Sequence, residues 1–417
     1  MNKEISIWQN RNFIKFFSAN TLANLGNWFD VIGVLILFRY TWKADPMLIA
    51  LIPIMYAIPS ILLGQFAGVF ADRIDKRKIL IYSNWFRAVL TLLLVFTPSP
   101  WLALPILFLR NTAGVISLPA QQGLMRNIVD EKDIMKAITI NGSLFQLVKV
   151  IGPLMGGSVA GIFSPNFSIA LNAIAFTISG IILTRVKVQE IETSVEIGAK
   201  QSGFLRSWKE GWHIVFKSKI LLASIIFGIF STLTIQMIDA QIVTLFSEVF
   251  PNKPGFIGWA ISGIGMGSLL VVILLSRLEK ISKFGWFFGT GSLLIGVMSV
   301  GFGFLLNYNF IALAIFLSII GGIGNGLTFV SINYLIQTEP PKEAIGRVTS
   351  IIDSLMSILF IAGPLLGGLL ITHLGVLTAF KIIGLGLSVI GIIGIVLQRL
   401  IWKQNNHAKE LIKVKVG

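Results

Sequence analysis

Long apolar segments separated by short polar breaks run through nearly the whole chain. An apolar run of roughly 20 residues is long enough to cross the hydrocarbon core of a bilayer as an α-helix. Reading from one polar or Pro/Gly break to the next predicts an all-α membrane protein with twelve transmembrane helices, at about residues 16–39, 46–71, 79–97, 101–124, 137–163, 166–184, 220–247, 254–276, 284–306, 308–336, 348–372 and 375–398.

One long polar interruption, residues 185–219, divides the twelve segments into six and six. Within it, Trp208, Trp212 and Phe216 recur at helical spacing among basic residues, which indicates an amphipathic helix lying on the inner membrane face. We therefore predict a six-helix half, a cytoplasmic linker, a second six-helix half and a basic cytoplasmic tail, at residues 1–184, 185–219, 220–402 and 403–417.

The two predicted halves share sequence motifs. IGPLMGG (Ile151–Gly157) reappears as AGPLLGG (Ala362–Gly368), in the fifth and eleventh segments. DRIDK (Asp72–Lys76) has a weaker counterpart in SRLEK (Ser276–Lys280), after the second and eighth segments. Matching motifs at matching places indicate a duplicated six-helix unit.

Composition supports the membrane interpretation, because 54% of the residues are hydrophobic and only 13% are charged, with a mean hydropathy of +0.82. About a quarter of a soluble protein's residues are charged. The net charge is +15, and the 34 Lys and Arg residues gather in alternate loops, whereas the opposite loops hold only Lys43 and Lys253. By the positive-inside rule, both termini are cytoplasmic.

The chain offers little for catalysis. It has no cysteine, which excludes disulfides and thiolate chemistry, and its three histidines show no metal-ligand spacing. A Gly-rich loop followed by Lys-Ser or Lys-Thr is also missing, which argues against ATP hydrolysis. We therefore expect no enzyme activity, no metal and no cofactor. Nucleic acid is not an expected partner, because the basic residues alternate between loops instead of covering one soluble face.

The stretch GVFADRIDKRK (Gly68–Lys78) resembles the signature loop between helices 2 and 3 of the major facilitator superfamily. The segment Pro119–Gly157, with its Pro-Ala, acidic loop and Gly-Pro-x-x-Gly-Gly, is similar to the macrolide-efflux-like and siderophore-exporter-like branch. The resemblance covers essentially the whole chain. It implies the major facilitator fold, with two pseudo-symmetric six-helix halves, and a monomeric carrier that works by alternating access and uses the proton gradient.

The resemblance also implies a role for the 68–78 loop as a gate. Gly68 would permit close helix packing, and Asp72 would face the start of helix 11, near Ile345–Val348, where the positive end of the helix dipole favours an anion. The same charge cluster would include Arg73, Lys76 and Arg77. The alternative is that the loop has no gating role and is basic only because it lies on the cytoplasmic side, as the positive-inside rule requires.

The two Gly-Pro-x-x-Gly-Gly motifs place a helix-bending proline among small residues that allow backbones to approach. They could form a functional bend or a seam between the halves, or only pack tightly. Thr139 and Val148 stand where exporters of the superfamily carry further glycines, so the antiporter signature is partial. The motif residues are Gly152, Pro153, Gly156, Gly157, Gly363, Pro364, Gly367 and Gly368.

Charged groups inside a membrane are costly, so they usually face a cavity or a partner. Asp30 follows Asn20, Asn24 and Asn27 on one helix face, and we expect this polar stripe to line the central cavity. Asp30 would then couple protons to transport, or else form a fixed ion pair.

Five further ionisable residues within the predicted spans are candidates for a role in the cavity, a gate or the structure. Lys149 could neutralise Asp30 or bind an anionic cargo group, and Arg110 is a second cavity candidate. Arg87 fits a structural ion pair or hydrogen-bond role. The carboxylates Asp239 and Asp353 are candidate proton or gate sites.

Together these features predict a multi-pass transporter of a bacterial inner membrane, with a small-molecule substrate, protons and the lipid bilayer as partners. The leading function is proton-coupled efflux of amphipathic drug-like compounds of the macrolide or multidrug type. A dedicated exporter of a siderophore, peptide antibiotic or lipid-like metabolite is the alternative. A membrane-embedded receptor or enzyme is a remote alternative, because no nucleotide, metal or nucleophile constellation is found.

Overall fold

The computed structural model describes five stretches of the chain: residues 7–187, 212–276, 283–308, 310–341 and 344–402. It does not describe five side chains inside these stretches, those of Gln65, Val69, Asp72, Asn307 and Tyr308. The described chain is helical, without strands. Most of the linker 185–219 and the whole tail 403–417 lie outside the described residues, so the amphipathic helix in the linker stays a prediction.

The first bundle contains six long helices. Proline at the first turn and capping side chains explain where several begin: Asp45 accepts a hydrogen bond from the Leu48 amide, and Ser164 accepts one from the Phe167 amide. The helices are α1 (Arg11–Ile36), which runs on through a π-helical turn (Leu37–Thr41), α2 (Pro46–Arg73), α3 (Lys76–Val95), α4 (Pro100–Ile128), α5 (Ile134–Ile162) and α6 (Pro165–Thr184).

The second bundle repeats this plan, with six long helices and three short ones in its described residues. Sequence analysis predicts one unbroken span at 220–247, and this is wrong, because the helix ends at Asp239 and a short helix follows. The elements are α8 (Lys219–Asp239), α9 (Ile242–Val249), α10 (Phe256–Leu275), α11 (Phe284–Gly303), α12 (Leu305–Tyr308), α13 (Ile311–Thr338), α14 (Ile345–Leu374), α15 (Val376–Val396) and α16 (Gln398–Ile401).

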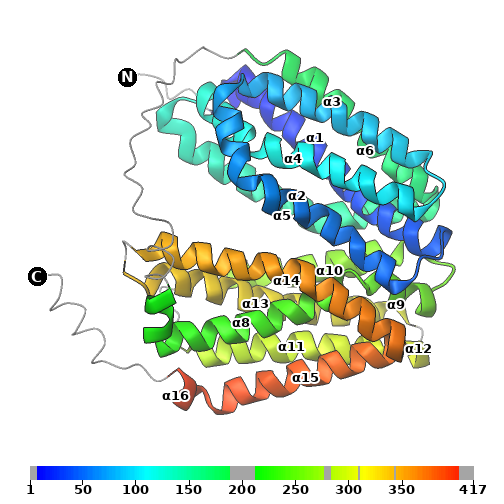
Figure 1. Cartoon of the computed structure of the whole chain (residues 1–417), viewed down its shortest axis with the longest axis vertical. Coiled ribbons are helices and arrows are strands. Elements are labelled where there is room, and N and C mark those ends of the chain that lie inside the picture. Colours follow the sequence, from blue (N-terminus) through cyan, green and yellow to red (C-terminus); the bar gives the residue numbers. More distant parts are fainter. Residues whose placement is uncertain (1–6, 188–211, 277–282, 309, 342–343, 403–417) are drawn as a thin grey trace, which may run out of the picture.

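The two bundles lie one above the other in Figure 1, and they meet mainly through two helix pairs, α5 with α10 and α2 with α14. We call the end where α1 begins at Arg11 the proximal end, and the end where α2 begins at Pro46 the distal end. Twelve of the described helices are long and apolar enough to cross a membrane, which confirms the predicted number of spans.

The bundles touch at the distal end. The Gln241 side-chain amide donates to the Pro46 carbonyl at 2.7 Å, and the Trp259 indole N–H donates to the Ser158 hydroxyl at 3.2 Å. Arg39 Nε donates to the Ser247 hydroxyl at 2.8 Å. Each of these contacts joins one bundle to the other, and we call the set the distal seam.

The proximal end is open by comparison, and Figure 1 shows the two bundles diverging toward it. Gly68 near the end of α2, Gly142 near the start of α5 and Gly346 at the start of α14 all have open space where a side chain would begin, with no atom within 4 Å. Among the residues that the structure describes, the hydrogen bonds that join the two bundles therefore lie at the distal end.

Candidate functional site

A cavity of ≈690 Å³ lies between the two bundles. Most of its lining comes from the second bundle, through α8, α10, α13 and α14, while α1, α2 and α5 contribute from the first. The lining is largely apolar, with residues such as Trp28, Ile235, Phe329 and Phe360. A cavity of this size and character suits one drug-sized molecule.

Three charged side chains line the cavity among the residues that the structure describes. Lys149 comes from α5 of the first bundle, and Asp239 and Asp353 come from α8 and α14 of the second. All three are exposed to the cavity. In the described part of the chain, none of them forms an ion pair within 4.0 Å or a side-chain hydrogen bond.

Asp239 owes its position to the break in the seventh span. It is the last residue of α8, and the chain turns there before α9 begins at Ile242. Gln241 is fully buried at the turn, where its side-chain amide donates to Pro46 and its side-chain oxygen accepts from the Thr244 hydroxyl at 2.8 Å. These bonds hold the turn in place and leave the neighbouring carboxylate free.

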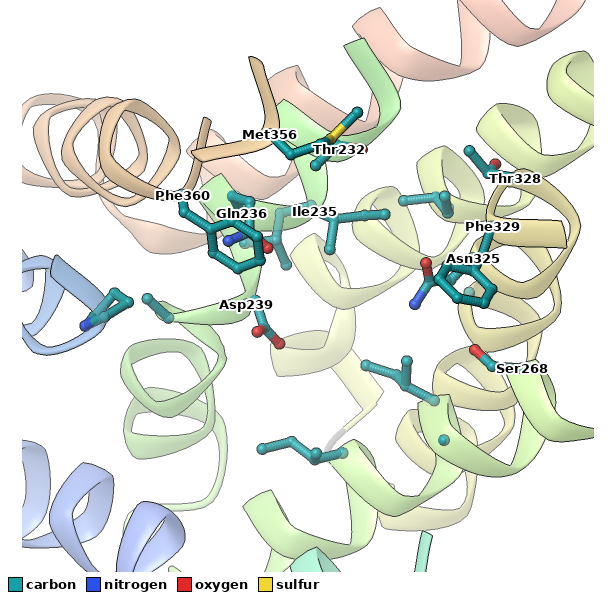
Figure 2. Close-up of a pocket in the computed structure, with 18 of the residues that line it drawn as sticks. Thr232, Ile235, Gln236, Asp239, Ser268, Asn325, Thr328, Phe329, Met356 and Phe360 are labelled. Carbon is teal, nitrogen blue, oxygen red and sulfur yellow. The ribbon is translucent and has the colours of Figure 1, made fainter. Parts of the chain in front are cut away.

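Figure 2 shows the Asp239 carboxylate directed into the cavity, with Asn325 and Ser268 facing it from the other side. Gln236, one turn earlier on α8, lies beside it. The second Gly-Pro-x-x-Gly-Gly motif packs against this turn: a side chain at Gly363 would collide with Gln236. The motif thus allows α14 to approach α8 next to the polar part of the cavity.

Asp30 has a different environment. Its exposed fraction is 1% and that of Arg110 is 3%, and the two form a bidentate pair, with Nη1 to Oδ1 and Nη2 to Oδ2 both at 2.5 Å. Arg110 also donates to the Tyr56 hydroxyl at 2.7 Å. Asp30 does not line the cavity, so the expected cavity position is wrong, and its partner is Arg110 instead of Lys149.

The asparagine stripe points into the first bundle as well. Arg87 donates to Asn27 Oδ1 at 3.0 Å, and its guanidinium lies 4.0 Å from the ring centroid of Phe176. Asn24 donates to the carbonyl of Asn20 on the preceding turn. These contacts bind α1 to α3 and α6, so the stripe does not face the cavity as sequence analysis expects. Arg87 has the structural surroundings that its sequence context favours.

Tyr56 is one of the site residues that sequence reasoning missed. It lines the cavity and its hydroxyl touches Arg110, so it connects the buried ion pair to the cavity wall. A tyrosine within or near an apolar span carries no sequence signal for such a role, because tyrosines are enriched at membrane–water interfaces, where they serve as anchors.

The 68–78 loop is held within the first bundle. Asp75 caps α3 by accepting from the Arg77 amide at 2.8 Å. The Arg77 side chain donates to the carbonyl of Thr184, the last residue of α6, and to that of Val186 just after it. Lys76 packs on α4, since a side chain at Gly123 would lie 2.5 Å from its Cε. Arg73 is exposed at the end of α2.

The gate contact of Asp72 with the start of α14 stays a prediction, because the Asp72 side chain lies outside the described residues. Such a contact would belong to a conformation closed at the proximal end, and this structure is closed at the distal end.

The first and second Gly-Pro-x-x-Gly-Gly motifs make equivalent contacts. Gly152 and Gly156 of α5 face α1, where added side chains would lie 2.5 and 2.7 Å from atoms of Trp28. Correspondingly, Gly363 and Gly367 of α14 face α8. The first two glycines of each motif therefore allow tight helix packing within their own bundle. Pro153 and Pro364 lie inside α5 and α14.

The last glycine of each motif faces the opposite bundle. A side chain at Gly157 would lie 2.7 Å from the Gly255 carbonyl and from Gly258 Cα at the start of α10. One at Gly368 would lie 3.1 Å from the Pro46 carbonyl of α2. These two glycines let the bundles approach closely at the distal end.

No group of three or more His, Asp or Glu side chains that could hold a metal ion is found in the described stretches. The described lining of the cavity presents two separate carboxylates, one ammonium and several amides and hydroxyls, which can bind and orient a small molecule.

The chain was compared with known proteins. It is 28% identical over 388 residues to the uncharacterized MFS-type transporter YfiS of Bacillus subtilis, covering 93% of each chain. It is 23% identical to macrolide efflux protein A of Streptococcus pyogenes, covering 83% of this chain and 86% of that one. It is also 23% identical to the staphyloferrin A transporter of Staphylococcus aureus, covering 89% and 92%.

The fold matches a solved structure, the bacterial homologue of the human lysosomal transporter Spinster in its inward-facing, unoccupied conformation. The TM-score is 0.68 at 13% identity, over 94% of this chain and 96% of that one. The family model of the Major Facilitator Superfamily matches residues 16–359 and 254–414. With its twelve membrane helices in two bundles, its cavity between them and these matches, the chain belongs to the major facilitator superfamily of membrane transporters, which are not enzymes.

Proposed function

We propose that this protein exports amphipathic drug-like compounds by alternating access, in exchange for protons. The observation that carries the proposal is the largely apolar cavity of ≈690 Å³ between the two bundles, sealed at the distal end. The cavity accepts a molecule from one side only, as a carrier requires in one of its two states.

The proximal end is the cytoplasmic end in this proposal. The loops at that end hold most of the basic residues, and the positive-inside rule assigns such loops to the cytoplasm. Both termini are then cytoplasmic, and the structure is the inward-facing state. Cargo enters the cavity from the cytoplasm or from the inner leaflet of a bacterial inner membrane.

Proton coupling is assigned to the buried Asp30–Arg110 pair. Both carboxylate oxygens are occupied by the guanidinium, which in turn contacts Tyr56 on the cavity wall. A proton on Asp30 would remove its charge and weaken this bidentate pair. Because the pair joins α1 to α4 and reaches α2 through Tyr56, its loss changes the relative stability of the two conformations, which is what drives a switch.

The relatives support efflux, and two of their names suggest two kinds of cargo, a macrolide and a siderophore. A siderophore rich in carboxylates would need several cations in the cavity. Among the described lining residues, Lys149 is the one cation, and it is outnumbered by Asp239 and Asp353. Arg87 and Arg110 lie away from the lining. The cavity thus favours drug-like cargo over a dedicated siderophore exporter.

The test is efflux of the fluorescent cation ethidium from proteoliposomes under an imposed pH gradient, for the wild type and for Asp30→Asn. We expect gradient-driven efflux by the wild type and its loss in the variant. Asp130→Asn, at an exposed loop carboxylate, is the matched control and should behave as wild type. Wild-type efflux at the same rate with and without the pH gradient would refute proton coupling. If the wild type transports none of a broad panel of dyes, the dedicated-metabolite alternative is favoured.

A further inference from the structure

We infer that Asp239 binds the positively charged part of the cargo, and that Lys149 is the resident cation which this group displaces; the inference rests on the proposed transport function. The cargo class is then amphipathic organic cations. Four observations lead to this assignment.

The Asp239 carboxylate is free. It is exposed to the cavity and, within the described part of the chain, has no ion pair or side-chain hydrogen bond. A bare carboxylate within the membrane is costly unless it meets a counter-charge. The other well-placed carboxylate, Asp30, already has its partner in Arg110 and is sealed from the cavity. Asp239 therefore has no cation in direct contact among the described residues. The same holds for Asp353, but that carboxylate lies inside α14 and not at the end of a helix.

The backbone adds to the same electrostatic preference. Asp239 is the last residue of α8, and the C-terminal end of a helix carries a partial negative charge that stabilises nearby cations. This end exists because the seventh span breaks at Ala240 and Gln241.

The walls suit the apolar part of such a cargo. Phe360 of α14 and Phe329 of α13 line the same cavity as Asp239 (Figure 2). Aromatic faces attract organic cations as well as apolar surface. The amides of Gln236 and Asn325 can orient polar groups without adding charge.

Lys149 supplies the counter-charge when the cavity is empty. It lines the same cavity as Asp239, and opposite charges attract over such distances even though the two groups form no ion pair within 4.0 Å. Lys149 stands on α5 of the first bundle and Asp239 on α8 of the second, so this attraction crosses between the halves. A cargo cation that approaches Asp239 replaces Lys149, and the two cations compete for one carboxylate.

The test compares two probes of the same tetraphenyl shape and opposite charge, tetraphenylphosphonium and tetraphenylborate. Binding of each is measured by equilibrium dialysis on the purified full-length protein in detergent, without any gradient. We expect wild type to bind the phosphonium more tightly than the borate. Asp239→Asn should weaken phosphonium binding about tenfold or more, and Asp239→Glu should restore most of it.

Two further variants separate this site from a general effect of charge. Lys149→Gln should strengthen phosphonium binding several-fold, because it removes the competing cation. Asp353→Asn removes the other cavity carboxylate and should change the affinity less than threefold. The inference is overturned if phosphonium binding is unaffected by Asp239→Asn, if neither probe binds, or if borate binds more tightly and depends on Lys149.

The result can be separated from the fate of the proposed function. Binding that depends on Asp239, without gradient-driven transport of the same cation, would uphold the site and refute the exporter. Gradient-driven transport, together with a phosphonium affinity that Asp239→Asn leaves unchanged, would uphold the exporter and refute this site.

Discussion

At the residue scale, Asp30 and Asp239 are both membrane carboxylates, but they have different surroundings. Asp30 has both oxygens on Arg110 and an exposed fraction of 1%, whereas Asp239 projects into the cavity without a partner among the described residues. From the sequence, both are candidates for a proton or gate role. Their surroundings could not be predicted, because spacing along one helix indicates which residues share a face, but not which arginine of another helix contacts that face.

The buried pair predicts a clear order of stability. Arg110→Gln leaves the Asp30 charge without its partner, and breaking a buried ion pair in this way typically costs about 3–5 kcal/mol. The double variant Asp30→Asn with Arg110→Gln removes both charges and should recover much of that loss. The melting temperature of each purified protein in detergent measures the order. Equal melting temperatures for wild type and Arg110→Gln would contradict the structural weight given to the pair.

At the element scale, the glycine motifs and the break in the seventh span position the cavity. The repeated Gly-Pro-x-x-Gly-Gly could be found in the sequence, and the structure assigns separate tasks to its glycines: Gly152 and Gly363 face their own bundle, while Gly157 and Gly368 face the other. The break after Asp239 could not be found, because the residues around it continue an apolar run without a proline or glycine.

Gly157 offers a test of the distal seam. Gly157→Ala places a Cβ within 2.7 Å of backbone atoms of α10, so the two bundles must separate there and the population should shift toward the distal-open state. Gly142→Ala, on the same helix but in open space, is the matched control.

The readout uses the absence of natural cysteines. A single cysteine at Gly68, where a side chain meets open space at the proximal end, should react rapidly with a maleimide in an otherwise wild-type chain. Adding Gly157→Ala should slow the labelling several-fold, while adding Gly142→Ala should leave it unchanged. An unchanged rate with Gly157→Ala would mean that this glycine contact does not hold the distal end closed.

At the scale of the whole molecule, two bundles are joined at one end around a cavity. The number of spans, their approximate bounds and the internal repeat followed from hydrophobic pattern and motif alone. The contacts at the distal end could not be predicted in this way, because they join residues distant in sequence, such as Arg39 with Ser247 and Gln241 with Pro46. Sequence analysis also left open which conformation would be observed.

Arg39 belongs to the polar part of this seam. Besides its bond to Ser247, its guanidinium lies 3.7 Å from Glu248, whose side chain is 45% exposed. Exposed ion pairs contribute about 0–1 kcal/mol. Arg39→Gln should therefore shift the conformational population in the same direction as Gly157→Ala but less. Spin-label distances across the distal end measure the shift. Lys43→Asn, which removes an exposed cation of the same distal turn, is the control. A larger shift for Lys43→Asn than for Arg39→Gln would contradict the assigned seam.

The central claim is that outward movement of an organic cation is exchanged for protons, and proton movement tests it most directly. Proteoliposomes are loaded with ethidium and a trapped pH indicator and diluted into cargo-free buffer, with potassium and valinomycin clamping the membrane potential. Protein-free liposomes give the passive leak. The account predicts that cargo leaving through the wild-type protein acidifies the interior, and that Asp30→Asn abolishes this acidification. Protein-dependent loss of cargo without any change of internal pH would contradict exchange and make the protein a uniporter.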